Sequence, residues 1–366
     1  MCPYRGGVRV ICCFGLYPVH VDGKYGYINK TGSIVIKPQF MYADNFSEGL
    51  AAVSENGDKY GYIDTSGTMV IRPQFHTAEA FSEGLAAVET GTGKDMRWGF
   101  VDKTGRLAIS AQFTSVSKFS EGLCCVSIKK DGQDITGFID KTGTWVIKAG
   151  QTAQSDFSEG VALTMFSNHN GYAIINQKGK VIAQLPEGMI GDSISPGFSE
   201  GLAVVRDIFP PYNSSEGYID KSGKVVIKPQ FVWAYDFSEG LAAAGIYENG
   251  VQKYGYIDKT GTWVIQPQFS MANAFSEGLA AVCTGGATPN DMRWGFIDKT
   301  GKIVIKLQKK GLVSTKLRFS GGVAGVETYT VAGEEIVSDS MTYIDTTGKA
   351  IWQGKGLGTP AAGSGP

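Results

Sequence analysis

Residues 237–269 read FSEGLAAAGIYENGVQKYGYIDKTGTWVIQPQF, and this stretch contains every element that the rest of the chain repeats. Its segments LAAA, YGYI and WVIQPQF are short and apolar, and Gly, Asn or Asp residues separate them. Short runs of β-branched and aromatic residues between such residues are typical of β-strands joined by turns. We therefore expect three antiparallel strands in this unit.

The second and third segments are joined by Asp258-Lys259-Thr260-Gly261. An Asp or Asn side chain can accept a hydrogen bond from the backbone N–H two residues on, and Gly can adopt the left-handed conformation that closes a type I turn with a G1 bulge. All copies keep Asp or Asn first and Gly fourth. The pattern predicts a hairpin turn rather than a chemical motif.

Two further residues of the unit carry positional information. A glycine within a strand, such as Gly255, indicates close approach of another group, and we expect an aromatic ring of the neighbouring copy to lie over it. Pro267 cannot donate to a β-ladder, so it should end the third strand or place that strand at an edge.

The unit recurs nine times. A repeat of about 40 residues is typical of solenoids, propellers and other arrays. Copies 1 to 3 resemble copies 6 to 8, which indicates duplication of a five-repeat block. We expect the array to cover residues 4–354, with a flexible Gly/Pro/Ala tail at 355–366. The repeats begin near Tyr4, Phe46, Phe81, Phe119, Phe157, Phe198, Phe237, Phe275 and Phe319.

Composition narrows the functional classes. The 366 residues include 50 glycines, which favours an all-β chain with many turns, and the formal net charge is −1. This balance argues against a nucleic-acid partner, which needs a concentrated basic face. The apolar stretch 7–19 is too short to span a membrane and is followed by no clear cleavage site, so we expect a cytoplasmic location, with a secreted or surface-associated protein as the alternative.

The stretches MRWGFIDKTGKIVIK (292–306) and FSEGLAAV (46–53) resemble the bacterial WG-containing repeat, also called the KWG repeat. Copy 5, with Asn170 in the aromatic position, and copy 9, with Thr342 in place of glycine, depart from the pattern. The resemblance implies a β-repeat scaffold that is often attached to other bacterial domains, and it supplies no catalytic residue.

We expect nine three-stranded units in an open, curved, solenoid-like array, with closed propeller-like rings as the alternative. Nine units exceed the usual four to eight blades of a propeller. The shortest copies are also small for a four-stranded blade. Stacking in an open array avoids both objections.

Sites for catalysis or metals are not evident. The three histidines, His20, His76 and His169, fall in different copies, so we expect solvated residues, no enzyme activity, no metal and no cofactor. The recurring FSEG glutamates could form an acidic row, but a turn role with a solvated or backbone-bonded carboxylate is favoured. The lysines of the Asp-Lys-Thr-Gly turns are interpreted as residues that block edge pairing.

The most variable part of each copy lies just before the YGYID segment, with long insertions at 12–22, 206–216 and 327–340. Binding residues often lie on loops held by a rigid frame, and aromatic residues are common at interaction hot spots. We therefore predict partner-binding roles for exposed aromatic residues in the first two insertions. These residues are Phe14, Tyr17, Phe209 and Tyr212.

The sequence thus favours a non-enzymatic scaffold that binds a protein through its variable loops. The alternative is a carbohydrate or cell-wall binding module that uses repeated aromatic sites. A third hypothesis is an appendage of a larger bacterial enzyme or toxin.

Overall fold

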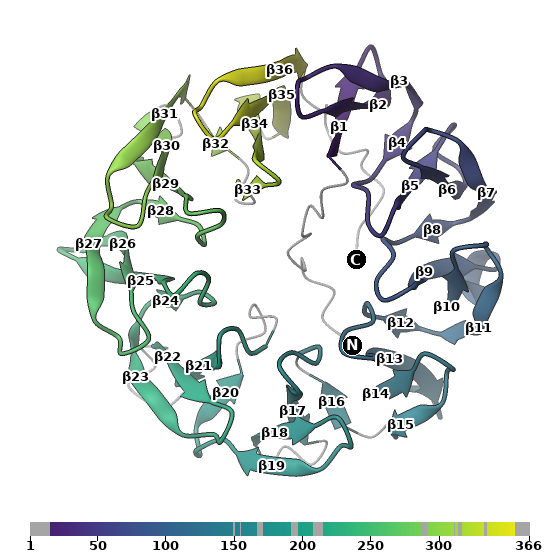
Figure 1. Ribbon diagram of the computed structural model, residues 1–366. Helices are drawn as coiled ribbons and strands as arrows, with labels where there is room; N and C mark the ends of the chain where they lie inside the picture. Colours follow the sequence, from purple (N-terminus) through teal and green to yellow (C-terminus); the bar gives the residue numbers. More distant parts are fainter. Residues whose placement is uncertain are drawn as a thin grey trace.

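The computed structural model describes residues 15–148, 151–153, 155–166, 171–191, 197–207, 215–286, 291–310, 312–313, 317–332 and 335–355. These residues form nine antiparallel sheets, each built from strands that are consecutive in the sequence. The sheets stand around a central opening (Figure 1). The arrangement is a nine-bladed β-propeller, and the blades are numbered here in chain order.

Blades 2 to 8 each have four strands in hydrogen-bonded order, from a short inner strand to an outer edge strand. Blade 1 contains β1 (Leu16–Val21), β2 (Lys24–Asn29) and β3 (Ile34–Phe40). Blade 2 contains β4 (Tyr42–Ala43), β5 (Leu50–Ser54), β6 (Tyr60–Asp64) and β7 (Met69–Phe75). Blade 3 contains β8 (Thr77–Ala78), β9 (Leu85–Thr90), the 3-10 helix η1 (Gly93–Asp95), β10 (Arg97–Asp102) and β11 (Leu107–Phe113). Blade 4 contains β12 (Ser115–Val116), β13 (Leu123–Lys130), β14 (Gln133–Asp140) and β15 (Trp145–Ile147).

The same order continues through the second half of the ring. Blade 5 contains β16 (Gln151–Ala153), β17 (Val161–Phe166), β18 (Tyr172–Asn176) and β19 (Val181–Gln184). Blade 6 contains β20 (Met189–Gly191), β21 (Leu202–Asp207), β22 (Glu216–Asp220) and β23 (Val225–Phe231). Blade 7 contains β24 (Trp233–Ala234), β25 (Ala242–Glu248), β26 (Val251–Ile257) and β27 (Trp263–Phe269). Blade 8 contains β28 (Met271–Ala272), β29 (Ala280–Thr284), β30 (Arg293–Ile297) and β31 (Ile303–Lys310). Blade 9 contains β32 (Leu312–Val313), β33 (Phe319–Ser320), β34 (Val323–Ala332), β35 (Glu335–Asp345) and β36 (Ala350–Lys355).

The expectation of an open array was wrong, because blade 9 packs against blade 1 and closes the ring (Figure 1). The Tyr343 hydroxyl donates to the Pro18 carbonyl at 2.7 Å. The rings of Tyr17 and Tyr343 lie 5.5 Å apart, inside an apolar cluster shared by the two blades. Nine blades are more than usual, and they close here through contacts specific to this seam.

The expected number of strands per unit was also wrong. The additional strand is only two residues long in most blades, as in β4 and β8, and directly follows the outer strand of the preceding blade. Two residues show no alternation of apolar and polar side chains, so the sequence pattern cannot separate this strand from a linker. The short inner strand also explains how a unit of this length holds four strands.

The hairpin turns match the prediction. In blade 7 the Gly261 N–H donates to the Asp258 carbonyl at 2.9 Å, and Gly261 has a φ of +84°. Asp258 Oδ1 accepts from the N–H groups of Thr260 and Thr262 at 2.9 and 3.0 Å. The same bonds recur at the other Asx-Gly turns, so this phrase of the sequence serves the backbone.

Gly255 does mark a close approach, but the approaching group is not the neighbour's aromatic ring. A Cβ at this position would lie 2.3 Å from the Ile265 carbonyl oxygen and 2.8 Å from the Pro267 nitrogen. Both atoms belong to β27 of the same blade, where the pairing with β26 shifts at a bulge. Pro267 lies in this bulged outer strand, which confirms the edge position expected for it.

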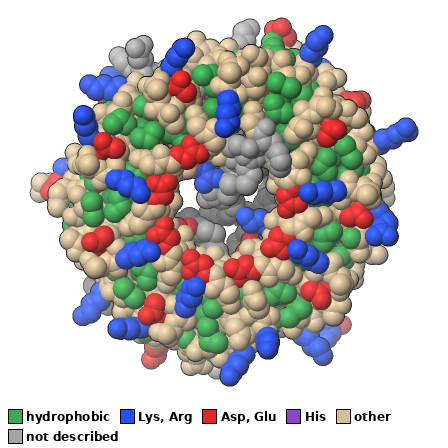
Figure 2. Space-filling model, viewed as in Figure 1, with side chains coloured by type: hydrophobic (Ala, Val, Ile, Leu, Met, Phe, Trp, Pro, Cys, Tyr) green, Lys and Arg blue, Asp and Glu red, His purple; other side chains and the backbone are tan. Residues whose placement is uncertain are grey.

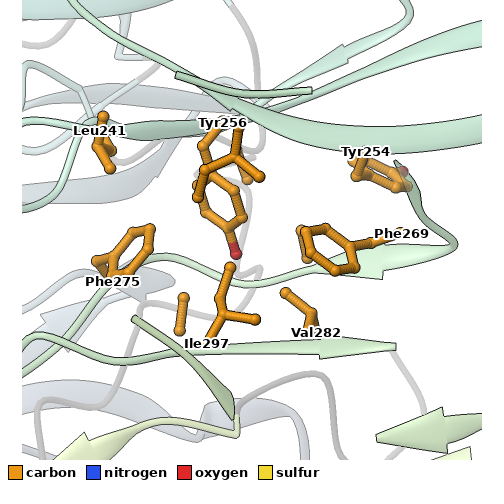
Figure 3. Close-up of a cluster of buried hydrophobic side chains, with 11 residues drawn as sticks. Leu241, Tyr254, Tyr256, Phe269, Phe275, Val282 and Ile297 are labelled. Atoms are coloured by element: carbon orange, nitrogen blue, oxygen red, sulfur yellow. The ribbon is translucent and has the colours of Figure 1, made fainter. Parts of the chain in front are cut away.

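Apolar side chains fill the space between neighbouring blades. Between blades 7 and 8, Tyr256 and Phe269 of one blade meet Val282 and Ile297 of the next (Figure 3). The ring of Phe275, which begins the FSEG motif of blade 8, lies 4.8 Å from the ring of Tyr256. Equivalent clusters fill the other interfaces, so the core is a chain of similar clusters around the ring.

The FSEG loops connect neighbouring blades by hydrogen bonds. Ser82 Oγ of blade 3 donates to the carbonyl of Phe119 in blade 4 at 2.7 Å, and Glu83 Oε2 accepts from the Gly122 N–H at 2.9 Å. The FSEG glutamates adopt φ values of 51 to 56°, a left-handed conformation that is strained for a non-glycine residue. The bond to the next blade offsets this strain. The backbone-bonded role expected for these glutamates is confirmed.

Five turn lysines have a role that the sequence interpretation missed. The Lys141 ammonium lies 3.1 Å from Glu83 Oε2, across the interface between blades 3 and 4. Figure 2 shows acidic side chains around the central opening with basic ones beside them. We call the side of the ring that carries the FSEG loops and Asx-Gly turns the turn face. The equivalent pairs are Lys103 with Glu48, Lys221 with Glu159, Lys259 with Glu200 and Lys299 with Glu239.

We predict that Gly255→Ala destabilises the protein more than Gly250→Ala. A Cβ at residue 255 would overlap backbone atoms that cannot move separately, and it should cost at least about 2 kcal/mol. Gly250 has open space and a φ of +77°, so alanine there should cost only about 1–2 kcal/mol of backbone strain. Urea unfolding of both variants measures the difference, and equal losses would contradict the bulge contact.

We also predict loss of stability in acid. Burial raises the pKa of the Glu83 carboxyl, but hydrogen bonds from Lys141 and the Gly122 N–H more than offset this, so the pKa is lowered overall. Hydrogen bonds from Thr260 likewise lower the pKa of Asp258. A carboxyl with a lowered folded-state pKa stabilises the fold above its unfolded pKa, about 4, and this contribution is lost as pH falls through the folded value.

The thermal midpoint should therefore be constant above about pH 5 and fall progressively below about pH 4. Glu83→Gln should be less stable than wild type at pH 7, and the difference should shrink as the pH falls. A difference that grew in acid would contradict this account.

Candidate functional site

The opposite side of the ring carries the connections between the second and third strands of the four-stranded blades. We call it the hairpin face. These connections differ in length and sequence. A tight turn at Glu248–Val251 joins β25 to β26, whereas a longer segment joins β21, which ends at Asp207, to β22, which begins at Glu216. The variable part of the repeat therefore lies on one face.

Blade 6 departs from the repeat at the base of its long connection. Glu216 occupies the position before glycine that is aromatic in blades 1, 2, 3, 7 and 8, and it is fully buried. Its Oε1 accepts from Arg206 Nη2 and Nε at 2.5 and 3.1 Å, and its Oε2 accepts from the Ala234 N–H at 2.5 Å. A buried carboxylate is tolerated when it is paired and hydrogen-bonded in this way.

The ion pair also orients an aromatic side chain of blade 7. The Arg206 guanidinium lies 5.7 Å from the ring centroid of Trp233, a cation–π arrangement. The Asp207 N–H donates to the Ser215 carbonyl at 2.9 Å, which closes the base of the connection. Residues 206 and 216 thus form a rigid stem beside Trp233.

Three tyrosines of blade 7 extend this aromatic group. Tyr235 is 39% exposed and its ring lies 6.2 Å from that of Tyr254, while Tyr247 is 62% exposed. Gln252 Nε2 donates to the Tyr254 hydroxyl at 2.6 Å. Burial and, to a smaller extent, the nearby Tyr235 raise the pKa of Tyr254, so this phenol stays neutral at physiological pH. We call Arg206, Trp233, Tyr235, Tyr247 and Tyr254 the blade 6–7 surface.

The predicted site residues have different outcomes. Phe14, Phe209 and Tyr212 lie outside the described residues. Tyr17 was expected in an exposed loop, but it lies in β1 and is only 1% exposed. Leu16 pairs with Asn29 as Leu50 pairs with Asp64, so β1 takes the place of a GLAAV strand. The Tyr17 hydroxyl donates to the Ser320 and Gly321 carbonyls of blade 9, so this residue helps to close the ring.

The insertion at 327–340 was also wrongly expected to be a loop. Its described residues continue β34 and β35, which pair from Val323 with Asp345 to Ala332 with Glu335. Of the three long insertions, the one at 206–216 therefore keeps the character of a variable connection, and its stem is the Arg206–Glu216 pair.

The described part of the chain holds no cluster of three or more His, Cys, Asp or Glu residues able to bind a metal ion. His20 lies 4.8 Å from the Tyr25 ring, and His76 Nε2 lies 2.8 Å from Lys59 Nζ. His169 lies outside the described residues. No helix in the described ranges is long and apolar enough to cross a membrane.

We predict that Arg206→Ala lowers the free energy of unfolding by about 3–5 kcal/mol, because it leaves the Glu216 carboxylate buried without its cation. Lys253→Ala is the matched control in the next blade. It removes a pair with Glu248 of the same 2.5 Å length, but the side chains there are 37% and 52% exposed. That loss should stay below about 1 kcal/mol. Similar losses in chemical denaturation would contradict a buried, structural ion pair.

One solved structure agrees with this architecture. A solved structure of a eukaryotic initiation factor covers 93% of this chain and 96% of its own, at 12% identity and a TM-score of 0.62, which shows a shared fold. AztD from Citrobacter koseri is similar at 13% identity over 94% of this chain and 95% of its own, with a TM-score of 0.40. BamB from Moraxella catarrhalis is similar at 11% identity over 91% and 92%, with a TM-score of 0.36. No curated protein sequence matches the chain.

The model of the WG containing repeat matches this chain seven times, and the matched segments together span more than half of it. They are residues 25–58, 60–93, 98–131, 137–168, 217–246, 254–286 and 294–308. The expected family is thereby confirmed: the chain belongs to the family of proteins built from the WG containing repeat.

Proposed function

We propose that this protein is a non-enzymatic scaffold that binds a protein partner through the hairpin face of its ring. The observation that carries this proposal is the different use of the two faces. On the turn face, the recurring Ser, Glu and Lys side chains bond to a neighbouring blade, as at Ser82, Glu83 and Lys141. The hairpin face instead varies from blade to blade, as recognition surfaces on rigid frames do.

The blade 6–7 surface is the part of this face best suited to a protein partner. Trp, Tyr and Arg are the residues that most often dominate binding energy at protein interfaces. Trp233 is held beneath Arg206, and Tyr235 beside Tyr254, so little side-chain entropy would be lost on binding. Tyr247 stands further out, with 62% of its surface exposed.

A carbohydrate ligand is the second candidate, because aromatic residues also gather on blades 1 and 2. The ring of Tyr42 lies 6.4 Å from that of Tyr25 and 5.2 Å from that of Tyr60. The interplanar angles are 51° and 74°, so the rings pack against one another rather than forming a flat platform for a sugar. This geometry favours the protein partner.

The compartment that we propose for this protein is still the cytoplasm.

We predict that Tyr235→Ala/Tyr247→Ala weakens partner binding roughly 10-fold or more, because it removes two exposed aromatic contacts. The partner would be captured on the immobilised protein, identified by mass spectrometry, and its affinity measured by surface plasmon resonance. The control is Val226→Ala/Val264→Ala on the outer strands, where the side chains are 40% and 48% exposed.

Full affinity in the tyrosine variant, or an equal loss in the valine control, would contradict the blade 6–7 surface as the binding site. A glycan array run on the wild type tests the second candidate. Selective glycan binding that disappears in Tyr42→Ala would favour carbohydrate over protein.

A further inference from the structure

A cavity of about 260 Å³ opens in blade 8, apart from the blade 6–7 surface. Its walls come entirely from β29, β30 and β31. The lining residues are Val282, Thr284, Arg293, Trp294, Gly295, Ile303, Lys306 and Leu307.

The cavity lies where the bulged backbone of blade 8 stands away from Gly295, whereas that of blade 7 covers Gly255. In blade 7 the backbone at Pro267 covers Gly255, with the proline nitrogen 2.8 Å from the position of a Cβ. In blade 8 the corresponding residue is Leu307, and the pairing of β30 with β31 shifts again at a bulge, between Arg293 and Gly295. Beyond the Ile305 carbonyl, the next atom near a Cβ at Gly295 is Ile303 Cγ2 at 3.4 Å. The space that residues 266 and 267 cover beside Gly255 is therefore open beside Gly295.

The lining combines an apolar wall with positive charge. Val282, Ile303 and Leu307 supply aliphatic surface, while Arg293 and Lys306 bring two cations. Lys306 forms no ion pair with any residue in the described ranges. A carboxylate with an apolar body matches both features, because the charge would meet the cations and the body the aliphatic wall.

Trp294 provides an independent indication of a missing ligand. Its side chain is only 3% exposed, and its indole Nε1–H has no hydrogen-bond partner in the described structure. Buried donors are normally satisfied, so an orphaned one calls for an explanation. The Nε1 atom has no accessible surface, so a carboxylate oxygen in the cavity would supply the acceptor once the indole turns toward it on binding.

We propose that this cavity binds an apolar group that carries a carboxylate, either a free organic acid or the C-terminal residue of a peptide. The two sources share the same chemistry, and the volume suits one branched or linear aliphatic group rather than a drug-sized ligand. This site is independent of the partner proposed for the blade 6–7 surface, and either can exist without the other.

The test is isothermal titration calorimetry of the intact protein with four probes. Hexanoate and its neutral analogue hexanamide test the free acid. An acetylated peptide that ends in leucine and the same peptide with an amidated C-terminus test the peptide source. We expect one of the two carboxylates to bind, its amide to bind at least 10-fold more weakly, and Lys306→Gln to weaken the carboxylate by a similar factor. Binding of hexanoate identifies a free organic acid as the ligand. Binding of the peptide with a free C-terminal carboxylate, without binding of hexanoate, identifies a peptide C-terminus.

The matched control is Leu307→Pro/Lys309→Phe, which gives blade 8 the Pro-Gln-Phe sequence of its sister blades. It should bring the bulged backbone over Gly295 as in blade 7, fill the cavity and abolish binding while circular dichroism stays that of a folded β-protein. The exposed Lys306→Gln variant keeps the test valid if the double variant fails to fold. The proposal is overturned if neither carboxylate binds, if the amides bind equally well, or if the folded double variant binds as wild type does.

Discussion

The ring depends on one recurring contact, the bond between each FSEG loop and the loop of the next blade. A serine hydroxyl donates to the following phenylalanine carbonyl at 2.7–2.8 Å at seven consecutive interfaces. The glutamate carboxylate bonds to the following glycine N–H at the same interfaces. Because the same atoms meet each time, each blade takes the same rotation relative to the last. Repetition of one local geometry therefore produces a closed circle rather than an irregular stack.

The seam between blades 9 and 1 shows what happens where this contact is replaced. Blade 9 has Gly321 in the position of the glutamate, so no carboxylate can reach the next blade. Tyrosines take over: Tyr17 donates to the Ser320 and Gly321 carbonyls, and Tyr343 donates to Pro18. Burial, with smaller effects of nearby charges, raises the pKa of Tyr343, so the hydroxyl remains a donor. The seam is thus closed by side chains of its own.

These two kinds of contact explain which features the sequence could predict. The Asx-Gly turn and the edge proline involve bonds within a few residues or a single blade, and both were predicted correctly. Ring closure depends on the sum of the rotations between nine successive blades, which no local motif specifies. It also depends on Tyr17, which the sequence analysis placed in an exposed loop. The Arg206–Glu216 pair joins residues on adjacent strands across a variable connection. Only its signal, a glutamate in an aromatic position, was present in the sequence.

Departures from the repeat thus indicate where function can reside, but they differ in one physical respect. In blade 6 the substituted Glu216 has gained partners, since Arg206 and the Ala234 N–H satisfy its carboxylate. That departure is compensated within the fold, and its consequence is a rigid aromatic surface. In blade 8 the bulged backbone stands away from Gly295 and leaves a cavity, and the Trp294 N–H stays unpaired in the described structure. That donor is not compensated within the fold, and it is the group that the proposed carboxylate ligand would complete.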